Sequence, residues 1–250
     1  MANQFDPRTS FRGADPAIAV GVPTVARDAG LRSYMLKVYN YMASGVLLTG
    51  VVAMLFANSS LMSLLVNPAT GQRSILFWVA LFAPLGLVMW LGMGINRMKT
   101  STAQAIFWAY AGLIGVQFST LFLAFTGTSI AQAFFATAAG FAGLSLYGYT
   151  TKRDLSGMGT FFVMGVVGLL VAMLVNMFLH SSTMELLISC VGVLLFAGLT
   201  VYDTQKIKSV YFQVRGSDFA GKAVVMGALN LYMDFINMFL FLLRFMGDRR

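Results

Sequence analysis

Seven apolar stretches, each about 20 residues long, constrain the fold of this chain more than any other feature. A helix of about 20 residues crosses the ~30 Å hydrocarbon core of a bilayer. We therefore place spans at residues 38–57, 75–95, 103–125, 130–149, 159–179, 184–203 and 223–246. The stretches are apolar on all sides rather than alternating, which argues against barrel strands. The sequence predicts an all-α membrane protein with seven transmembrane helices.

The composition agrees with this fold class. The chain is 58% hydrophobic and 10% charged, with a mean hydropathy of +0.77. Soluble domains carry about 25% charged residues, so this chain has too few to cover a water-exposed surface. Its net charge of +8 is the difference between 17 basic and 9 acidic residues. The basic residues are spread over the loops and form no dense basic stripe. The composition therefore indicates the lipid bilayer as partner and gives no sign of nucleic-acid binding.

The N-terminal segment differs from the rest of the chain. Residues 1–36 are polar, contain three prolines and lack the apolar core of a signal peptide. We predict a flexible cytoplasmic tail over 1–36, whose last part near Arg32 to Tyr39 runs into the first helix. Residues 37–250 are predicted to form the seven-helix transmembrane domain.

The basic residues predict the orientation. The tail and the loops on its side hold 13 of the 17 lysines and arginines, so the positive-inside rule places the N-terminus in the cytoplasm. Seven crossings then place the C-terminus outside, together with Arg244, Arg249 and Arg250. We expect a full crossing by the last segment. The alternative is that this segment does not cross completely.

Small residues recur at four-residue spacing in the fourth span. Ala136 pairs with Gly140, and Ala139 pairs with Gly143. Such pairs let helix backbones approach closely in lipid. They predict a compact helix bundle and give no information about a catalytic or binding site.

Several classes of catalytic site are missing from the sequence. His180 is the single histidine, which rules out an HExxH metal site, and Ser156 has no histidine near it to act as a base. No GxxxxGK[ST] loop is present, and the last span has no lysine at mid-depth. We expect neither an enzyme nor a resident cofactor.

Two aspartates fall within the membrane spans. Asp234 lies near the middle of the last span, and Asp203 follows directly on the apolar run of the sixth. If the sixth helix continues toward Phe212, Asp203 lies deeper than the end of that run suggests. Ionisable groups inside a membrane are costly, so each is a functional hypothesis. Tyr202, Lys206 and Tyr232 are candidate supporting residues, since a lysine side chain can extend toward a buried carboxyl group.

Two carboxyl groups that face each other in a bundle of low dielectric constant cannot both stay charged without a cation. The pair then titrates as a unit. At low pH a shared proton lets the two groups hydrogen-bond and hold their helices together. Once deprotonated they repel each other or bind a cation such as Ca²⁺, which favours carboxylate oxygens. The alternative is that Asp203 and Asp234 separately bond a lysine, a tyrosine or a backbone group.

Four segments resemble the Bax inhibitor family, also called transmembrane Bax inhibitor motif proteins, in its bacterial YccA-like branch. Residues 147–156 read YGYTTKRDLS and are similar to the signature between the fourth and fifth spans. Residues 196–207 read FAGLTVYDTQKI, and residues 228–237 read ALNLYMDFIN; they resemble the signatures of the sixth and seventh spans. The first span is similar at Val38, Tyr39, Met42, Gly45 and Thr49. The match runs in order from about residue 32 to 246.

The resemblance implies a seven-helix fold in which six helices surround the last, in a bacterial inner (cell) membrane. Family members are described as pH-sensitive Ca²⁺ leak channels whose aspartate pair acts as sensor and gate. That pair corresponds to Asp203 and Asp234, which also makes both aspartates candidate ligands of weakly bound calcium. Some members carry an arginine on the second helix that partners the pair. Between Ser74 and Asn96 this sequence has no Arg or Lys, so such a latch is absent or supplied from elsewhere.

Three functions are consistent with these observations. The first is a cation pathway, for Ca²⁺, gated by the aspartate pair. The second, implied by the resemblance, is a modulator or substrate of a membrane-bound AAA protease complex without ion transport, engaged through the tail. The third is an intramembrane aspartyl protease. It is disfavoured because Leu231, Tyr232 and Met233 replace the glycines of the GxGD motif before Asp234.

Overall fold

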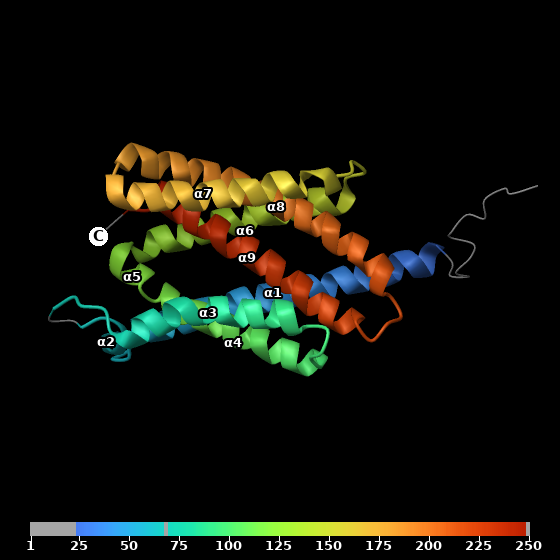
Figure 1. The fold of residues 1–250 in the computed structure, drawn as a ribbon, viewed down its shortest axis with the longest axis horizontal. Helices are drawn as coiled ribbons and strands as arrows, with labels where there is room; N and C mark the ends of the chain where they lie inside the picture. The colour runs from blue at the N-terminus through green and yellow to red at the C-terminus, as the bar shows by residue number, and fades with distance from the viewer. Residues whose placement is uncertain (1–23, 68–69, 249–250) are drawn as a thin grey trace, which may run out of the picture.

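The computed structural model describes residues 24–67 and 70–248, with side chains from Ala29 onward. Its long helices are α1 (Thr24–Ala57), α3 (Ile75–Gly94), α4 (Thr100–Phe118), α6 (Gly127–Thr150), α7 (Gly159–Leu179), α8 (Ser182–Val214) and α9 (Ala220–Met246) (Figure 1). Short helices α2 (Met62–Leu65) and α5 (Leu121–Ala124) and a 3₁₀ turn (Ser156–Met158) lie in the connections. In the described chain, seven helical segments are long and apolar enough to cross a membrane, which confirms the predicted fold class.

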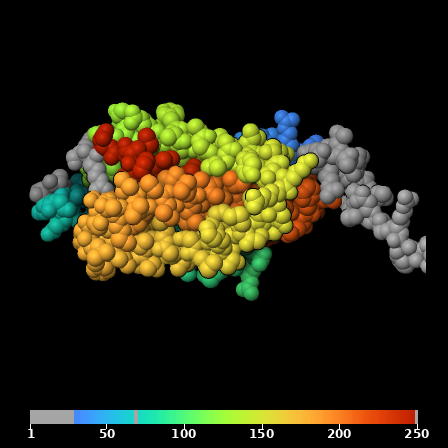
Figure 2. All heavy atoms as spheres, turned by 90° about the horizontal axis from the view of Figure 1, so that it is seen from above, coloured from blue at the N-terminus to red at the C-terminus, as the bar shows by residue number. Residues whose placement is uncertain are grey.

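Helix α9 forms the centre of the bundle. In its most apolar stretch 72% of the residues are buried, against 11–39% in the other candidate spans. Helices α1, α4, α6 and α8 contact α9 directly, while α3 packs on α4 and α7 packs on α8. In the space-filling view α9 reaches the surface as a patch near the C-terminus, between α6 and α8 (Figure 2). The prediction that the last helix is surrounded by the others is confirmed.

Two helices extend past the predicted spans at the end of the bundle where α1 begins. Helix α8 has 33 residues, about 50 Å at 1.5 Å per residue, so Asp203 lies inside a continuous helix. Helix α1 begins at Thr24, so the helix that was predicted to start near Arg32 to Tyr39 starts about two turns earlier, within the segment predicted as a flexible tail. The extensions support each other, because the rings of Tyr34 and Tyr211 pack 5.3 Å apart. The remainder of the predicted tail, residues 1–23, lies outside the described residues.

The path of the chain supports the predicted orientation. The α3–α4, α6–α7 and α8–α9 connections lie at the end of the bundle where α1 begins, and the C-terminus lies at the opposite end (Figure 1). The end of the chain is attached there, since Asp248 N donates to Ser129 Oγ at 3.0 Å and Thr126 N donates to Asp248 O at 3.3 Å. The last segment therefore crosses the bundle completely, as expected.

The closest contact of α6 differs from the one predicted. Gly140 and Gly143 are exposed, and a Cβ atom added at either would meet no described atom within 4 Å. The close approach is at Gly148, where an added Cβ would lie 2.6 Å from the main-chain oxygen of Val201 in α8. The small-residue pairs of this span were thus wrongly interpreted as packing contacts. They face away from the protein, and the contact lies two turns nearer the cytoplasm.

We expect Gly148→Ala to destabilise the protein by about 1–3 kcal/mol, because the backbone of α8 has to move away from the new methyl group. Gly143→Ala on the same helix is the matched control and should be neutral or slightly stabilising, since alanine favours helix by about 1 kcal/mol. Equilibrium unfolding in detergent measures both. Equal stability of the two variants would contradict the close approach of α6 and α8.

Candidate functional site

The two intramembrane aspartates meet at the centre of the bundle. Asp203 on α8 and Asp234 on α9 are in hydrogen-bonding contact through their side chains, and these two helices have the most extensive contact in the bundle. Asp234 is only 5% exposed, and its Oδ2 atom has no hydrogen-bond partner within the described chain. Carboxylate oxygens only accept hydrogen bonds, so a bond between two carboxyl groups requires that one of them hold a proton. The arrangement can therefore store or release a proton between two helices.

Polar groups of α8 and α1 surround Asp203. Thr200 and Thr204 are fully buried one turn before and one residue after it. Thr200 Oγ1 donates to the main-chain oxygen of Phe196 at 2.8 Å, while Thr204 Oγ1 lies 3.5 Å from the hydroxyl of Tyr39 in α1. The aspartate pair consequently lies at a junction of three helices, α1, α8 and α9.

Lys206 supplies the cation near the pair. Its ammonium group lies close enough to Asp203 for the charge to act on that carboxyl group, and it also lies 5.9 Å from the centre of the Tyr202 ring. Tyr202 packs on the opposite side against Gly159 at the start of α7. Lys206 is thus close to the pair, whereas the ring of Tyr202 packs against α7, and the supporting roles of both residues stay predictions.

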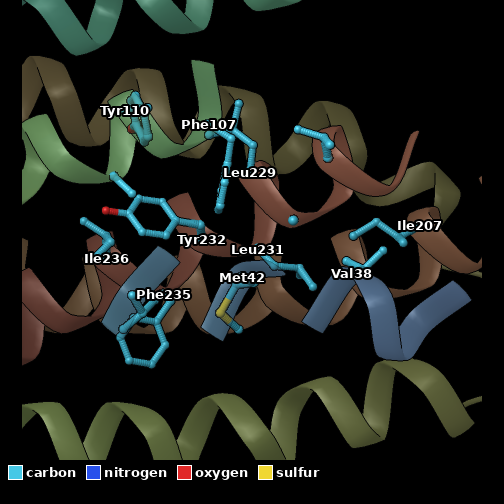
Figure 3. Packing of buried hydrophobic residues seen from close by; sticks show 14 of the residues in the cluster. Val38, Met42, Phe107, Tyr110, Ile207, Leu229, Leu231, Tyr232, Phe235 and Ile236 are labelled. Carbon is cyan, nitrogen blue, oxygen red and sulfur yellow. The ribbon is translucent and has the colours of Figure 1, made fainter. Parts of the chain in front are cut away.

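Tyr232, the third predicted supporting residue, faces away from the pair. Its hydroxyl lies 2.6 Å from Thr49 Oγ1, and the one proton of Thr49 is directed to main-chain oxygens, which only accept: that of Ala111 in α4 at 2.9 Å and that of Gly45 in α1 at 3.0 Å. Tyr232 therefore donates to Thr49. Its ring contacts Phe107 and Tyr110 of α4, whereas the ring of Phe235, one turn further along α9, points toward α6 (Figure 3). Tyr232 thereby fixes α9 against α1 and α4.

Gln205 is a residue that the sequence analysis missed. Its side chain accepts from the main-chain N–H of Leu155 at 2.8 Å and donates to the main-chain oxygen of Arg153 at 2.7 Å. In the same loop Ser156 N–H donates to Asp154 Oδ1 at 2.9 Å, and this hydrogen bond holds the pKa of Asp154 below its ordinary value. Gln205 thus attaches the loop between α6 and α7 to α8, two residues from Asp203. The one sequence feature that could have indicated this role is that Gln205 lies within the sixth-span motif, residues 196–207.

We expect Tyr232→Phe to lower the stability by about 1–2 kcal/mol, because it removes the hydroxyl that joins α9 to Thr49 in the buried core. Tyr147→Phe is the control, since Tyr147 is 55% exposed on α6. Unfolding of both variants in detergent gives the difference. A Tyr232→Phe variant as stable as the control would show that this hydroxyl contributes nothing to packing.

Replacing Gln205 should free the loop that it holds. In Gln205→Leu the N–H of Leu155 and the carbonyl of Arg153 lose their side-chain partner, so amide hydrogen exchange at residues 151–156 should become at least about tenfold faster. Ser209→Ala, one turn further along α8 and exposed, serves as control. Unchanged exchange in Gln205→Leu would mean that the loop is held by other contacts.

Comparison with known proteins agrees with the motifs. Residues 31–250 match the protein-family model described as "Inhibitor of apoptosis-promoting Bax1". Uncharacterized protein RP147 of Rickettsia prowazekii is 49% identical over 225 residues, 89% of this chain and 92% of that protein. An uncharacterized protein of Caulobacter vibrioides is 43% identical over 247 residues, 96% and 98% of the two chains. The inner membrane protein YbhL of Escherichia coli K12 is 43% identical over 225 residues, 89% and 94% of the two chains.

Proposed function

This chain belongs to the Bax inhibitor-1 family, and we propose that it is a pH-sensitive cation leak channel, conducting Ca²⁺, whose gate is the pair Asp203 and Asp234. One observation carries the proposal. Two carboxyl groups are in contact across the main helix–helix interface of the bundle, and one of them is almost completely buried in its central helix. The role is conduction, and it requires no bond-making chemistry.

The gate follows from the protonation of the pair. With one shared proton the two groups hydrogen-bond and hold α8 against α9. Without it, two charges about 4 Å apart repel each other by about 4 kcal/mol at an effective dielectric constant near 20. That repulsion is relieved when the helices separate or when a cation enters between them. A rise in pH therefore favours the open state.

Ca²⁺ is the cation that suits this pair, because hard divalent cations prefer carboxylate oxygens. Two carboxylates supply at most four oxygens, whereas Ca²⁺ takes six to eight ligands, so water has to supply the remainder. Within the described chain no group of three or more His, Cys, Asp or Glu side chains could hold a metal ion. Weak coordination of this kind suits an ion that passes through rather than one that stays bound.

The cellular location follows from the relatives and the spans. YbhL is named an inner membrane protein, and this chain has seven candidate spans in its described part. We infer a multi-pass protein of the bacterial inner membrane with its N-terminus in the cytoplasm. The basic residues of the α3–α4, α6–α7 and α8–α9 connections support this orientation.

Flux of Ca²⁺ into liposomes that contain the purified protein tests the proposal. We expect the wild-type flux at pH 8 to exceed that at pH 6 by about tenfold, which corresponds to ~1.4 kcal/mol between the two states. Asp203→Asn and Asp234→Asn should each make the flux independent of pH, because the remaining carboxylate then faces a neutral amide and has no second charge to repel it. Asp218→Asn in the α8–α9 connection is the control and should behave as wild type.

The outcomes separate the gate from the pathway. Flux that keeps its pH dependence in both aspartate variants would refute the gate. Absence of flux above that of empty liposomes at either pH would refute the channel itself. In that case the modulator or substrate role toward a membrane-bound AAA protease would become the better hypothesis.

A further inference from the structure

An apolar groove runs along the membrane face between α1 and α6. Its cytoplasmic half is a cavity of about 690 Å³, which adjoins a second of about 440 Å³ toward the outer side. The two cavities share the lining residues Val46, Leu47, Phe134 and Phe235. Both α1 and α6 pack on α9, and within the described residues they have no extensive contact with each other. The groove is therefore floored by α9.

The floor of the groove is aromatic. Phe235 of α9 points toward α6 (Figure 3). Its ring packs 5.5 Å from Phe141 and 5.7 Å from Phe134. In a membrane such a surface has no water to exclude, so a flexible hydrocarbon chain is the occupant that fills it by van der Waals contact.

The cytoplasmic end of the groove is polar and basic. Arg32 carries the one charge among the described residues that line the larger cavity, and Tyr39 and Tyr149 line it nearby. The hydroxyl of Ser145, in the α6 wall, is buried without a hydrogen-bond partner in the described chain. A phospholipid of the cytoplasmic leaflet matches this order of groups, since its phosphate pairs with arginine and its ester carbonyls accept from hydroxyl groups.

The length of the larger cavity is close to the thickness of the hydrocarbon layer of one leaflet. From Met35 to Leu47 the lining spans thirteen residues of α1, a rise of about 18 Å over twelve steps of 1.5 Å. One leaflet contributes about 15 Å of hydrocarbon. One acyl chain thus reaches from the level of Arg32 to the shared residues at Val46 and Phe134.

We propose that the groove between α1 and α6 binds one anionic phospholipid of the cytoplasmic leaflet, with its phosphate at Arg32 and an acyl chain against Phe235. A second copy of the chain packed on this groove is the competing occupant, and the variants below distinguish it from a lipid. This site is separate from the aspartate pair, and the proposal does not depend on ion conduction.

Native mass spectrometry of the purified protein, titrated with phosphatidylglycerol or phosphatidylcholine, tests the site. We expect wild type to bind one phosphatidylglycerol in preference to phosphatidylcholine. Ala142→Phe fills the groove from α6 and should weaken binding of both lipids about tenfold. Ala139→Phe is its control, because Ala139 is exposed on the same helix and does not line the groove.

A second pair of variants tests the headgroup. Arg32→Gln should lower the preference for phosphatidylglycerol about fivefold and leave phosphatidylcholine unchanged. Arg97→Gln, an exposed arginine of the same side, should retain the preference. Binding by Ala142→Phe equal to that of Ala139→Phe would overturn the proposal. So would an unchanged preference in Arg32→Gln, or a dimer that Ala142→Phe dissociates.

Discussion

The contact between Asp203 and Asp234 is the interaction on which the arrangement of the bundle depends. An isolated charge at the depth of Asp234 would cost several kcal/mol, and α9 is the most buried helix of the protein. A second carboxyl group on α8 lowers this cost, because the two can share a proton. The contact requires α8 to lie along α9 at that depth, and this fixes which of the outer helices becomes its main neighbour.

The cytoplasmic side of the site is held by contacts that converge on α8. Gly148 lets α6 approach the backbone at Val201, and Tyr39 of α1 reaches Thr204. Gln205 holds the loop that follows α6. All three contacts lie within two residues of Asp203. A displacement of α8 at Asp203 therefore has to disturb α1, α6 and the loop between α6 and α7 together. Such coupled contacts favour two discrete arrangements of α8 over a gradual change.

The sequence predicted the features that depend on hydropathy and charge, namely seven spans, the end of the bundle at which each connection lies, and the two aspartates within the spans. It could not identify the contacts that depend on which face of a helix meets a neighbour. Gly140, Gly143 and Gly148 are alike in the sequence, but only Gly148 lies against another backbone. Gln205 was missed for a similar reason, since its partners are main-chain groups about fifty residues away. Hydropathy did not reveal the helical start of α1, because that segment is stabilised by packing on α8.

The two sides of α9 differ in how much movement they permit. Tyr232 is fully buried between α1 and α4, its hydroxyl hydrogen-bonded and its ring in contact with two aromatic rings. Phe235 faces a groove with free volume. Close-packed interiors resist displacement, whereas a groove filled by an acyl chain can change width as the chain rearranges. If the aspartates separate, α9 is therefore expected to shift toward α6, since Phe235, which follows Asp234 directly in the helix, lines the cavity of about 690 Å³.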